Sequence, residues 1–161
     1  MMTVLGKVAI RQSRPADTPT LTAILYDTFV STWLPYISAE AAEAFRKSNR
    51  PAEYVNKRGH EFWVAERDSE VIGFVDWQKD FVNALHVHTR FARTGAGTCL
   101  MEKAEIEIAR LGFLVARLET DTFNTASQSF YAKLGYEERE RYPDLEWDSG
   151  LTTILLVKRL G

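Results

Sequence analysis

The sequence has little of several features that would place it in a specialised class of protein. It contains one cysteine, Cys99, in 161 residues, so neither an internal disulfide nor a cysteine-based metal site can form. No stretch approaches the roughly 18 apolar residues of a membrane-spanning helix, and the first ten residues are too mixed for a secretory signal. Lysine plus arginine number 20 and aspartate plus glutamate 22, which leaves no overall basic charge for nucleic-acid binding. We therefore expect a cytoplasmic protein with no metal, no membrane contact and no nucleic-acid partner.

The composition is that of an ordinary globular domain. Hydrophobic residues make up 45% and charged residues 26% of the chain, and a chain of this length buries enough apolar surface to form its own core. No internal repeat or linker interrupts it. We expect one domain over residues 1–161.

The hydrophobic periodicity predicts a protein with both strands and helices. Helical patterns begin after Asp17, a candidate N-cap, and recur at about 38–46, 97–111 and 126–134, and a further helix is allowed after Pro51. Strands are expected at 8–11, 61–67, 71–77, 83–87, 114–120, 136–142 and 152–159. This order predicts an α/β (α+β) fold with a mixed, mostly antiparallel sheet of six to seven strands and about four flanking helices. A right-handed crossover should supply one parallel pair of strands.

A first segment, from Leu85 to Thr98, leads from a strand through a short basic loop and a Gly-x-Gly turn into a helix. Glycine allows a close approach of the backbone to a ligand, and the free N–H groups at a helix start attract anions. Arg93 and Arg90 add full positive charges, so a pyrophosphate would fit. A plain turning loop explains the glycines equally well, because short glycine motifs often match by chance.

A second segment runs from Asn124 to Tyr136. Asn124 is expected to cap a helix and Gly135 to end it. Ser127 and Tyr131 are four residues apart and share one face of that helix. Taken alone, the segment is more typical of a capped amphipathic helix with a surface tyrosine than of a functional site.

Together the two segments resemble the GNAT superfamily of acyl-CoA-dependent N-acyltransferases. The first follows the family pattern of an apolar-x-Val strand and then Gln/Arg-x-x-Gly-x-Gly/Ala at a helix start. The second follows Asn-x-x-(Ala/Ser)-x-x-(Phe/Leu)-Tyr-x-x-x-Gly-(Phe/Tyr) throughout. One position departs from the pattern, because Ala92 stands where the family has Gln or Arg. This change removes one contact to the pyrophosphate, and Arg93 is a candidate to compensate for it.

The resemblance implies a GNAT-like sheet with a strand-helix-strand-helix core that binds acetyl-CoA as cosubstrate, and it implies a homodimer. The residues that it assigns to the cofactor are Leu85, His86, Val87, Arg93, Thr94, Gly95, Ala96, Gly97, Thr98, Asn124, Ser127 and Tyr131. By the same resemblance, the N–H of Val87 stabilises the oxyanion and Tyr131 protonates the departing thiolate.

Acetyl transfer also needs a base, because an alkyl amine with a pKa of about 10.4 is mostly protonated at neutral pH. The sequence does not identify this base. We take Glu119 as the candidate, and Asp121, His86 and His88 remain open.

The acceptor amine is expected among aromatic and acidic side chains in three regions, at 33–36, 76–77 and 142–150. Aromatic faces beside carboxylates suit a cationic amine. Trp33, Tyr36 and Trp77 are the predicted substrate-binding residues, and the other members of the group are Phe123, Asp144, Glu146, Trp147 and Asp148. The aromatic residues are equally typical of core or dimer contacts.

Two other functions match parts of the sequence. A dinucleotide-binding enzyme needs a third glycine where Leu100 stands, and it needs the motif directly after a strand. We set that interpretation aside. A non-catalytic acyl-CoA-binding sensor or interaction module on the same fold stays open, because a fold does not guarantee an activity. The preferred hypothesis is an N-acetyltransferase that acts on a primary amine of a small molecule or peptide.

Overall fold

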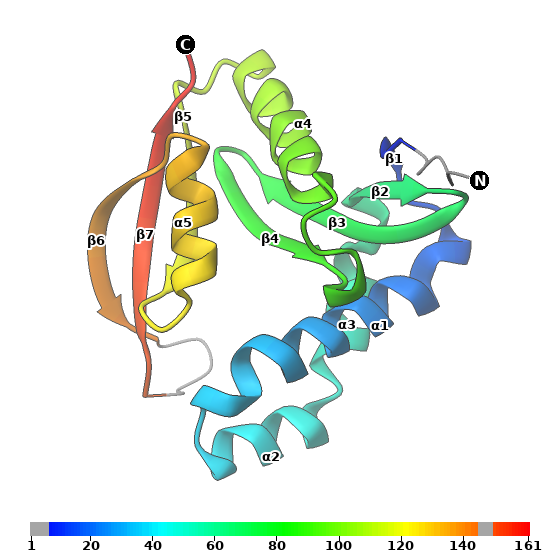
Figure 1. The fold of residues 1–161 in the computed structure, drawn as a ribbon, viewed down its shortest axis with the longest axis vertical. Helices are drawn as coiled ribbons and strands as arrows, with labels where there is room; N and C mark the ends of the chain where they lie inside the picture. Colours follow the sequence, from blue (N-terminus) through cyan, green and yellow to red (C-terminus); the bar gives the residue numbers. More distant parts are fainter. Residues whose placement is uncertain (1–6, 145–149) are drawn as a thin grey trace, which may run out of the picture.

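A computed structural model describes residues 7–144 and 150–161. Their strands form one seven-stranded sheet in the order β1-β2-β3-β4-β5-β7-β6 (Figure 1). Only β4 and β5 are parallel, and the other five neighbouring pairs are antiparallel. The strands are β1 (Ala9–Gln12), β2 (Trp63–Arg67), β3 (Glu70–Gln78), β4 (Phe81–Val87), β5 (Val115–Asp121), β6 (Glu137–Pro143) and β7 (Thr152–Arg159).

Five α-helices flank this sheet. They are α1 (Thr18–Thr28), α2 (Ala39–Ser48), α3 (Arg50–Arg58), α4 (Ala96–Arg110) and α5 (Thr125–Lys133). The mixed, mostly antiparallel fold predicted from the sequence is thus confirmed, and the helix allowed after Pro51 is present as α3. No helix among the described residues combines the length and the apolar character needed to cross a membrane.

The strands divide the core into two layers, one on each face of the sheet. Along β3, Ile72 and Val75 pack with residues of α4 and α5, while Val71 and Phe74 pack with residues of α1 and α3. The three-residue spacing departs from the simple alternation of a strand, because the register of β2 with β3 shifts between Ala65 and Glu66 and leaves Ile72 as an extra, bulged residue. Figure 1 shows α4 and α5 over one face, with α1 to α3 grouped below. The β4–β5 junction therefore lies between two helical layers.

The first helix begins differently from the prediction. Asp17 makes no side-chain cap to α1, because its carboxylate accepts hydrogen bonds from the Arg11 guanidinium at 2.9 and 3.0 Å and from the Arg14 N–H at 2.7 Å. The helix ends at Thr28, and the chain continues through a π-helical turn (Phe29–Trp33) and a 3-10 turn (Leu34–Tyr36).

Helix α5 follows its predicted signals closely. The Asn124 side chain accepts a hydrogen bond from the Ser127 N–H at 3.0 Å, so Asn124 is the N-cap. Gly135 follows the helix with φ of +99°, a conformation that favours glycine. The position of α5 on β5 is fixed by contacts between the two, since the Ser127 hydroxyl bonds the Thr120 hydroxyl at 2.8 Å and the Gln128 amide donates to the Asp121 carbonyl at 2.9 Å.

Candidate functional site

The centre of the candidate site is a gap between β4 and β5. These strands pair only at their beginnings, where Phe81 lies opposite Arg117 and Val82 opposite Leu118. At this closed end the Arg117 guanidinium also donates two hydrogen bonds of 3.0 Å to the Asp80 carboxylate. Beyond it the strands have no paired residues, so their later halves present unpaired edges to each other.

A bulge in β4 accounts for the separation. The register of β3 with β4 shifts between Asp76 and Trp77, which leaves Asn83 as an extra residue. A bulge bends its strand and increases the local twist. The Asn83 amide donates to the Asp76 carboxylate at 3.2 Å, and the same fully buried carboxylate accepts from Tyr54 at 2.6 Å and from Arg58 at 2.7 Å. These bonds tie the bulge to α3 and hold the gap open.

The edge of β4 that faces the gap offers unpaired peptide groups. The His88 N–H donates to the Ile72 carbonyl at 2.9 Å, and Gly73 is paired with Val87. Since the ladder of an antiparallel pair alternates, the N–H and C=O groups of Leu85 and Val87 point away from β3 and into the gap. These two predicted cofactor residues are therefore available to a ligand through their backbone.

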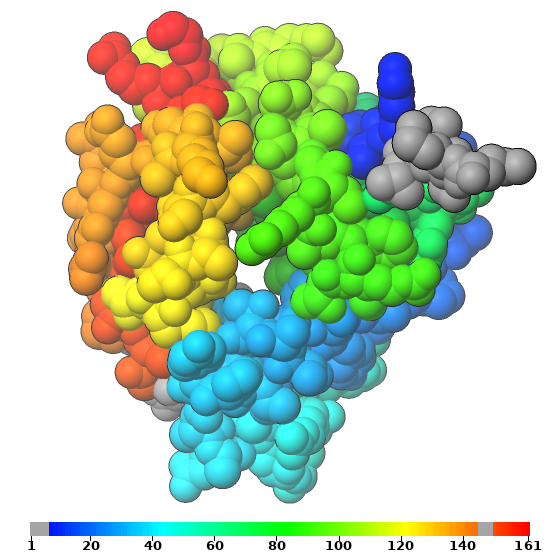
Figure 2. All heavy atoms as spheres, in the orientation of Figure 1, coloured from blue at the N-terminus to red at the C-terminus, as the bar shows by residue number. Residues whose placement is uncertain are grey.

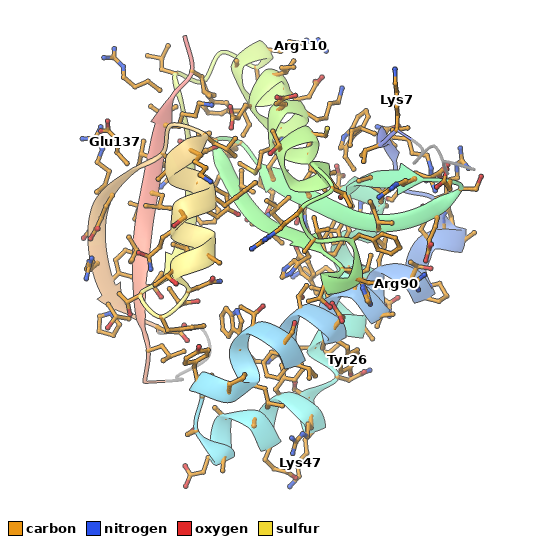
Figure 3. All side chains as sticks on the ribbon, in the orientation of Figure 1. Lys7, Tyr26, Lys47, Arg90, Arg110 and Glu137 are labelled. Carbon is orange, nitrogen blue, oxygen red and sulfur yellow. The ribbon has the colours of Figure 1, made fainter. Side chains whose placement is uncertain are left out.

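At the end of β4 the chain turns into α4 through two residues with positive φ, Arg93 (+64°) and Gly95 (+86°). The N–H groups of Gly97 and Thr98 make no hydrogen bond within the described residues. The guanidinium groups of Arg93 and Arg90 likewise form no ion pair there. Figure 3 shows Arg90 on the turn between β4 and α4, beside α1. Free N–H groups and two unpaired cations make this helix start suited to a phosphate.

Three other motif residues shape this turn. The Thr94 hydroxyl donates to the Phe91 carbonyl at 2.8 Å and accepts from the N–H of the buried Ala96 at 3.4 Å. A β-carbon on Gly97 would lie 3.2 Å from the Phe130 ring. The start of α4 therefore sits close against α5, and Figure 2 shows an opening between the yellow surface of α5 and the green surface of this segment.

Tyr131 of α5 lies on the sheet side of its helix, within the core, and is 8% exposed. Its hydroxyl makes no hydrogen bond within the described residues. Every buried polar side-chain atom of those residues has a partner, so the Tyr131 oxygen must reach solvent. Burial raises the pKa of Tyr131. Ser127 shares this face and bonds the Thr120 hydroxyl of β5 at 2.8 Å.

The two carboxylates of β5 differ in their surroundings. Glu119 is exposed and accepts a hydrogen bond of 2.7 Å from the Tyr142 hydroxyl. Asp121 is 7% exposed, and its carboxylate makes no hydrogen bond or ion pair within the described residues. Its pKa is raised to about 6, first by burial and then by the charges of Asp144 and Glu119. A base should have a pKa near the working pH, so Asp121 matches that role better than Glu119, our sequence-based candidate.

Neither histidine candidate matches the role of base. His86 uses its ring Nδ1 in a hydrogen bond of 2.9 Å to the Thr28 hydroxyl, and its ring packs against Phe74. Burial lowers the pKa of His86 to about 4, which makes it a weak base. His88 accepts from the Arg90 N–H through Nδ1 at 3.1 Å. The prediction of His86 as a cofactor residue also needs correction, because its peptide groups face β3 and its ring faces α1.

On the α1 side of the opening, the structure brings Trp33 and Tyr36 together with Phe123. The Tyr36 and Phe123 rings stack with centroids 4.5 Å apart, and Trp33 meets Phe123 edge-on at 6.4 Å. A cavity of about 230 Å³ lies beside them, lined by Ser31, Thr32, Tyr36, Phe123, Asn124, Thr125 and Ala126. Glu146, Trp147 and Asp148 fall outside the described residues.

The structure separates Trp77 from these aromatic residues. Trp77 pairs with Val82. Val82 is the last residue of β4 that pairs with β5. Trp77 therefore lies at the closed end of the gap, where its ring packs against the core under α4. The prediction of Trp77 as an acceptor-binding residue was wrong, because the sequence pattern does not reveal at which end the two strands separate.

Comparison with known proteins agrees with this geometry. Residues 58–138, just over half of the chain, match the family model described as acetyltransferase (GNAT) domain. An uncharacterized N-acetyltransferase of Methanocaldococcus jannaschii is 30% identical over 105 residues, which cover 61% of this chain and 65% of that protein. The match thus spans slightly less than two thirds of this curated relative.

Solved structures share the fold over nearly the whole chain. A GCN5-related N-acetyltransferase from Rhodopseudomonas palustris superposes with a TM-score of 0.79 at 20% identity, covering 99% of this chain and 100% of that one. The PaiA N-acetyltransferase of Thermoplasma acidophilum, in complex with coenzyme A, gives 0.74 at 22% identity, covering 95% and 99%.

Proposed function

Because this chain belongs to the GNAT acetyltransferase family, we propose that it transfers the acetyl group of acetyl-CoA to a primary amine of a small molecule or peptide. One observation supports this proposal most. The unpaired edge of β4 lies between an anion-attracting helix start and the solvent-reaching hydroxyl of Tyr131. The strand edge suits the pantetheine chain of acetyl-CoA, the helix start suits its pyrophosphate, and the Tyr131 hydroxyl suits the departing thiolate.

The residues present fit acetyl-CoA. In the proposal, the peptide groups of Leu85 and the carbonyl group of Val87 bond the amides of the pantetheine arm, and the Val87 N–H remains for the thioester carbonyl. The N–H groups of Gly97 and Thr98, assisted by Arg93, bind the pyrophosphate. Acetyl-CoA supplies the activated thioester when bound. The family's Gln or Arg is absent here, since Ala92 is an exposed methyl group, and neighbouring cations take over part of its charge.

The chemistry assigned to the protein has three parts. A carboxylate of β5 removes the proton from the ammonium group of the acceptor, so that the free amine can form the C–N bond. The Val87 N–H donates to the carbonyl oxygen as negative charge develops there. Tyr131 gives its proton to the thiolate sulfur as the C–S bond breaks, and is reprotonated from the amide nitrogen through solvent. One proton is released overall.

Its raised pKa keeps Tyr131 protonated at neutral pH, as an acid must be before it acts. The roles of Asn124 and Ser127 are to fix the start of α5, and so to position Tyr131.

We also propose a cytoplasmic protein that forms a homodimer. A single cysteine is usual in a reducing compartment, and the dimer is an expectation from the family. Light scattering coupled to size-exclusion chromatography tests the dimer directly.

The proposed activity is tested by two measurements on the whole chain. Calorimetry should show that acetyl-CoA binds, and a thiol-release assay over a panel of primary amines should show turnover. Binding without thiol release from any amine would support the sensor alternative instead. Absence of acetyl-CoA binding would contradict both functions.

A further inference from the structure

Three carboxylates gather where β5 and β6 end, and we call Glu119, Asp121 and Asp144 the acidic cluster. The charges of Glu119 and Asp144 act on Asp121, so the three lie within electrostatic reach of one another. The nearest cation of β5, Arg117, is engaged in its ion pair with Asp80 at the closed end of the gap. Glu119 and Asp121 form no ion pair within the described residues.

Asp121 is the unusual member of this cluster. Its residue is 7% exposed, yet its carboxylate has no hydrogen-bond or ion-pair partner within the described residues. A buried carboxylate without a partner is costly, and proteins seldom keep one unless a ligand pairs with it. No buried polar side-chain atom of the described residues lacks a partner, so the Asp121 oxygens reach space that a ligand can enter.

The space that the Asp121 oxygens reach lies on the side of the gap where the acceptor amine is expected. Strand alternation puts Glu119 and Asp121 on the face opposite Thr120, whose hydroxyl bonds Ser127 of α5. Two residues after Asp121, Phe123 stacks on Tyr36 beside the cavity described above. A ligand that approaches from the α1 side thus meets aromatic rings and carboxylates together, an arrangement that suits cations.

We propose that the acceptor is an amine that bears a second positive charge, and that Asp121 binds its reacting ammonium group and takes the proton from it. This inference rests on the proposed acetyl transfer and names the substrate class of that site. The remaining carboxylates of the acidic cluster attract the second charge. Acceptors with a carboxylate near the amine, such as amino acids and acidic peptides, are repelled by the same groups.

The reaction is then balanced as follows. One ammonium proton moves to the Asp121 carboxylate, and the amine nitrogen forms the C–N bond while the C–S bond breaks. The second nitrogen proton replaces the one that Tyr131 gives to the sulfur. Asp121 finally releases its proton to solvent, so the products are the acetylated amine, CoA thiol and one proton. No oxidant, reductant or metal takes part.

The substrate class is tested with three matched four-carbon amines: putrescine, butylamine and γ-aminobutyrate. We expect kcat/KM to fall in this order, with about tenfold or more between the first and the last. Glu119→Gln should reduce the preference for putrescine over butylamine, because it removes one charge of the acidic cluster without touching the base.

Asp121→Asn should lower kcat/KM for putrescine by about a hundredfold, the usual size of a lost general base. Its acetyl-CoA affinity by calorimetry should stay within about twofold, which also reports that the variant is folded. Glu137→Gln is the matched control. Glu137 lies at the outer edge of the sheet (Figure 3), at the start of β6, where it pairs with Val157 far from the open end of the gap.

The outcomes separate the two proposals. If acetyl-CoA binds and thiol is released equally with γ-aminobutyrate and putrescine, or if Asp121→Asn retains full activity, the inference is overturned and the acetyl transfer stands. If acetyl-CoA does not bind, the proposed function fails and the inference fails with it. A putrescine preference that Glu137→Gln retains and Asp121→Asn abolishes supports both.

Discussion

Replacing Asp121 with Asn should make the protein more stable at neutral pH while it removes activity. The pKa of Asp121 is raised from 3.8 to about 6 in the folded protein, mainly by burial. Below the pKa of Asp121 in the unfolded chain, this carboxyl is protonated in both the folded and the unfolded protein and does not lower the free energy of unfolding. As the pH rises toward the pKa of Asp121 in the folded protein, this residue ionises first in the unfolded chain. The free energy of unfolding therefore falls with pH, and the full loss is reached above about pH 6.

The size of this cost follows from the shift. One pKa unit corresponds to about 1.36 kcal/mol, so a shift of roughly two units costs about 3 kcal/mol. Asparagine has nearly the same shape and does not ionise, so Asp121→Asn should recover this amount above about pH 7 and none of it below about pH 4. For a chain of this length the gain corresponds to a rise in Tm of about 6–12 °C.

Urea unfolding of both proteins at a series of pH values measures this directly. The difference in unfolding free energy between Asp121→Asn and wild type should grow by about 3 kcal/mol from low to neutral pH, whereas Glu137→Gln should show less than about 0.5 kcal/mol. If the wild-type and Asp121→Asn curves run parallel across this range, Asp121 is not a buried carboxylate without a partner, and the reasoning is refuted.

Three further predictions concern the rest of the site. Tyr131→Phe should lower kcat by about a hundredfold or more with acetyl-CoA affinity nearly unchanged; an unchanged kcat in steady-state assays would remove Tyr131 as the acid. Arg93→Ala should weaken acetyl-CoA binding about fivefold and flatten its salt dependence in calorimetry; equal salt dependence in both proteins would place the pyrophosphate elsewhere. Arg58→Met should lower the unfolding free energy by about 3–5 kcal/mol in urea, because it leaves the buried Asp76 carboxylate without its cation; a loss below about 1 kcal/mol would show that Tyr54 and Asn83 suffice.

The sequence was informative where short-range chemistry decides the structure. The cap at Asn124 and the positive φ of Gly135 depend on neighbours within a few residues. The sequence pattern located all seven strands, and β2, β3, β5 and β7 alternate or run apolar, whereas β6 is exposed along most of its length. The turn before α4 was recognised for the same reason, since its glycine and its cations lie within one segment.

The sequence was uninformative where a contact joins distant residues. No local signal marks Asn83 as a bulge, because a bulge exists only in relation to the partner strand. Asp17 was expected to cap α1, but Arg11 on the neighbouring strand β1 engages its carboxylate. Trp77 was expected at the acceptor, and only the pairing of β4 with β5 shows that it lies at the closed end.

The sequence alone also does not identify which of the candidate residues acts as the base. Glu119 and Asp121 are two residues apart on one strand face and are chemically alike. Their difference comes from Tyr142, which engages Glu119, and from the packing that buries Asp121. Long-range packing sets a pKa, and a single sequence does not encode that packing in a readable pattern.

The central claim is acetyl transfer from acetyl-CoA to an amine, and mass spectrometry of the products tests it most directly. Wild-type protein incubated with isotopically labelled acetyl-CoA and putrescine should yield labelled N-acetylputrescine and an equal amount of free CoA, and Tyr131→Phe should yield far less. Labelled acetyl-CoA that remains intact with every amine offered, while the protein binds it, would contradict the claim.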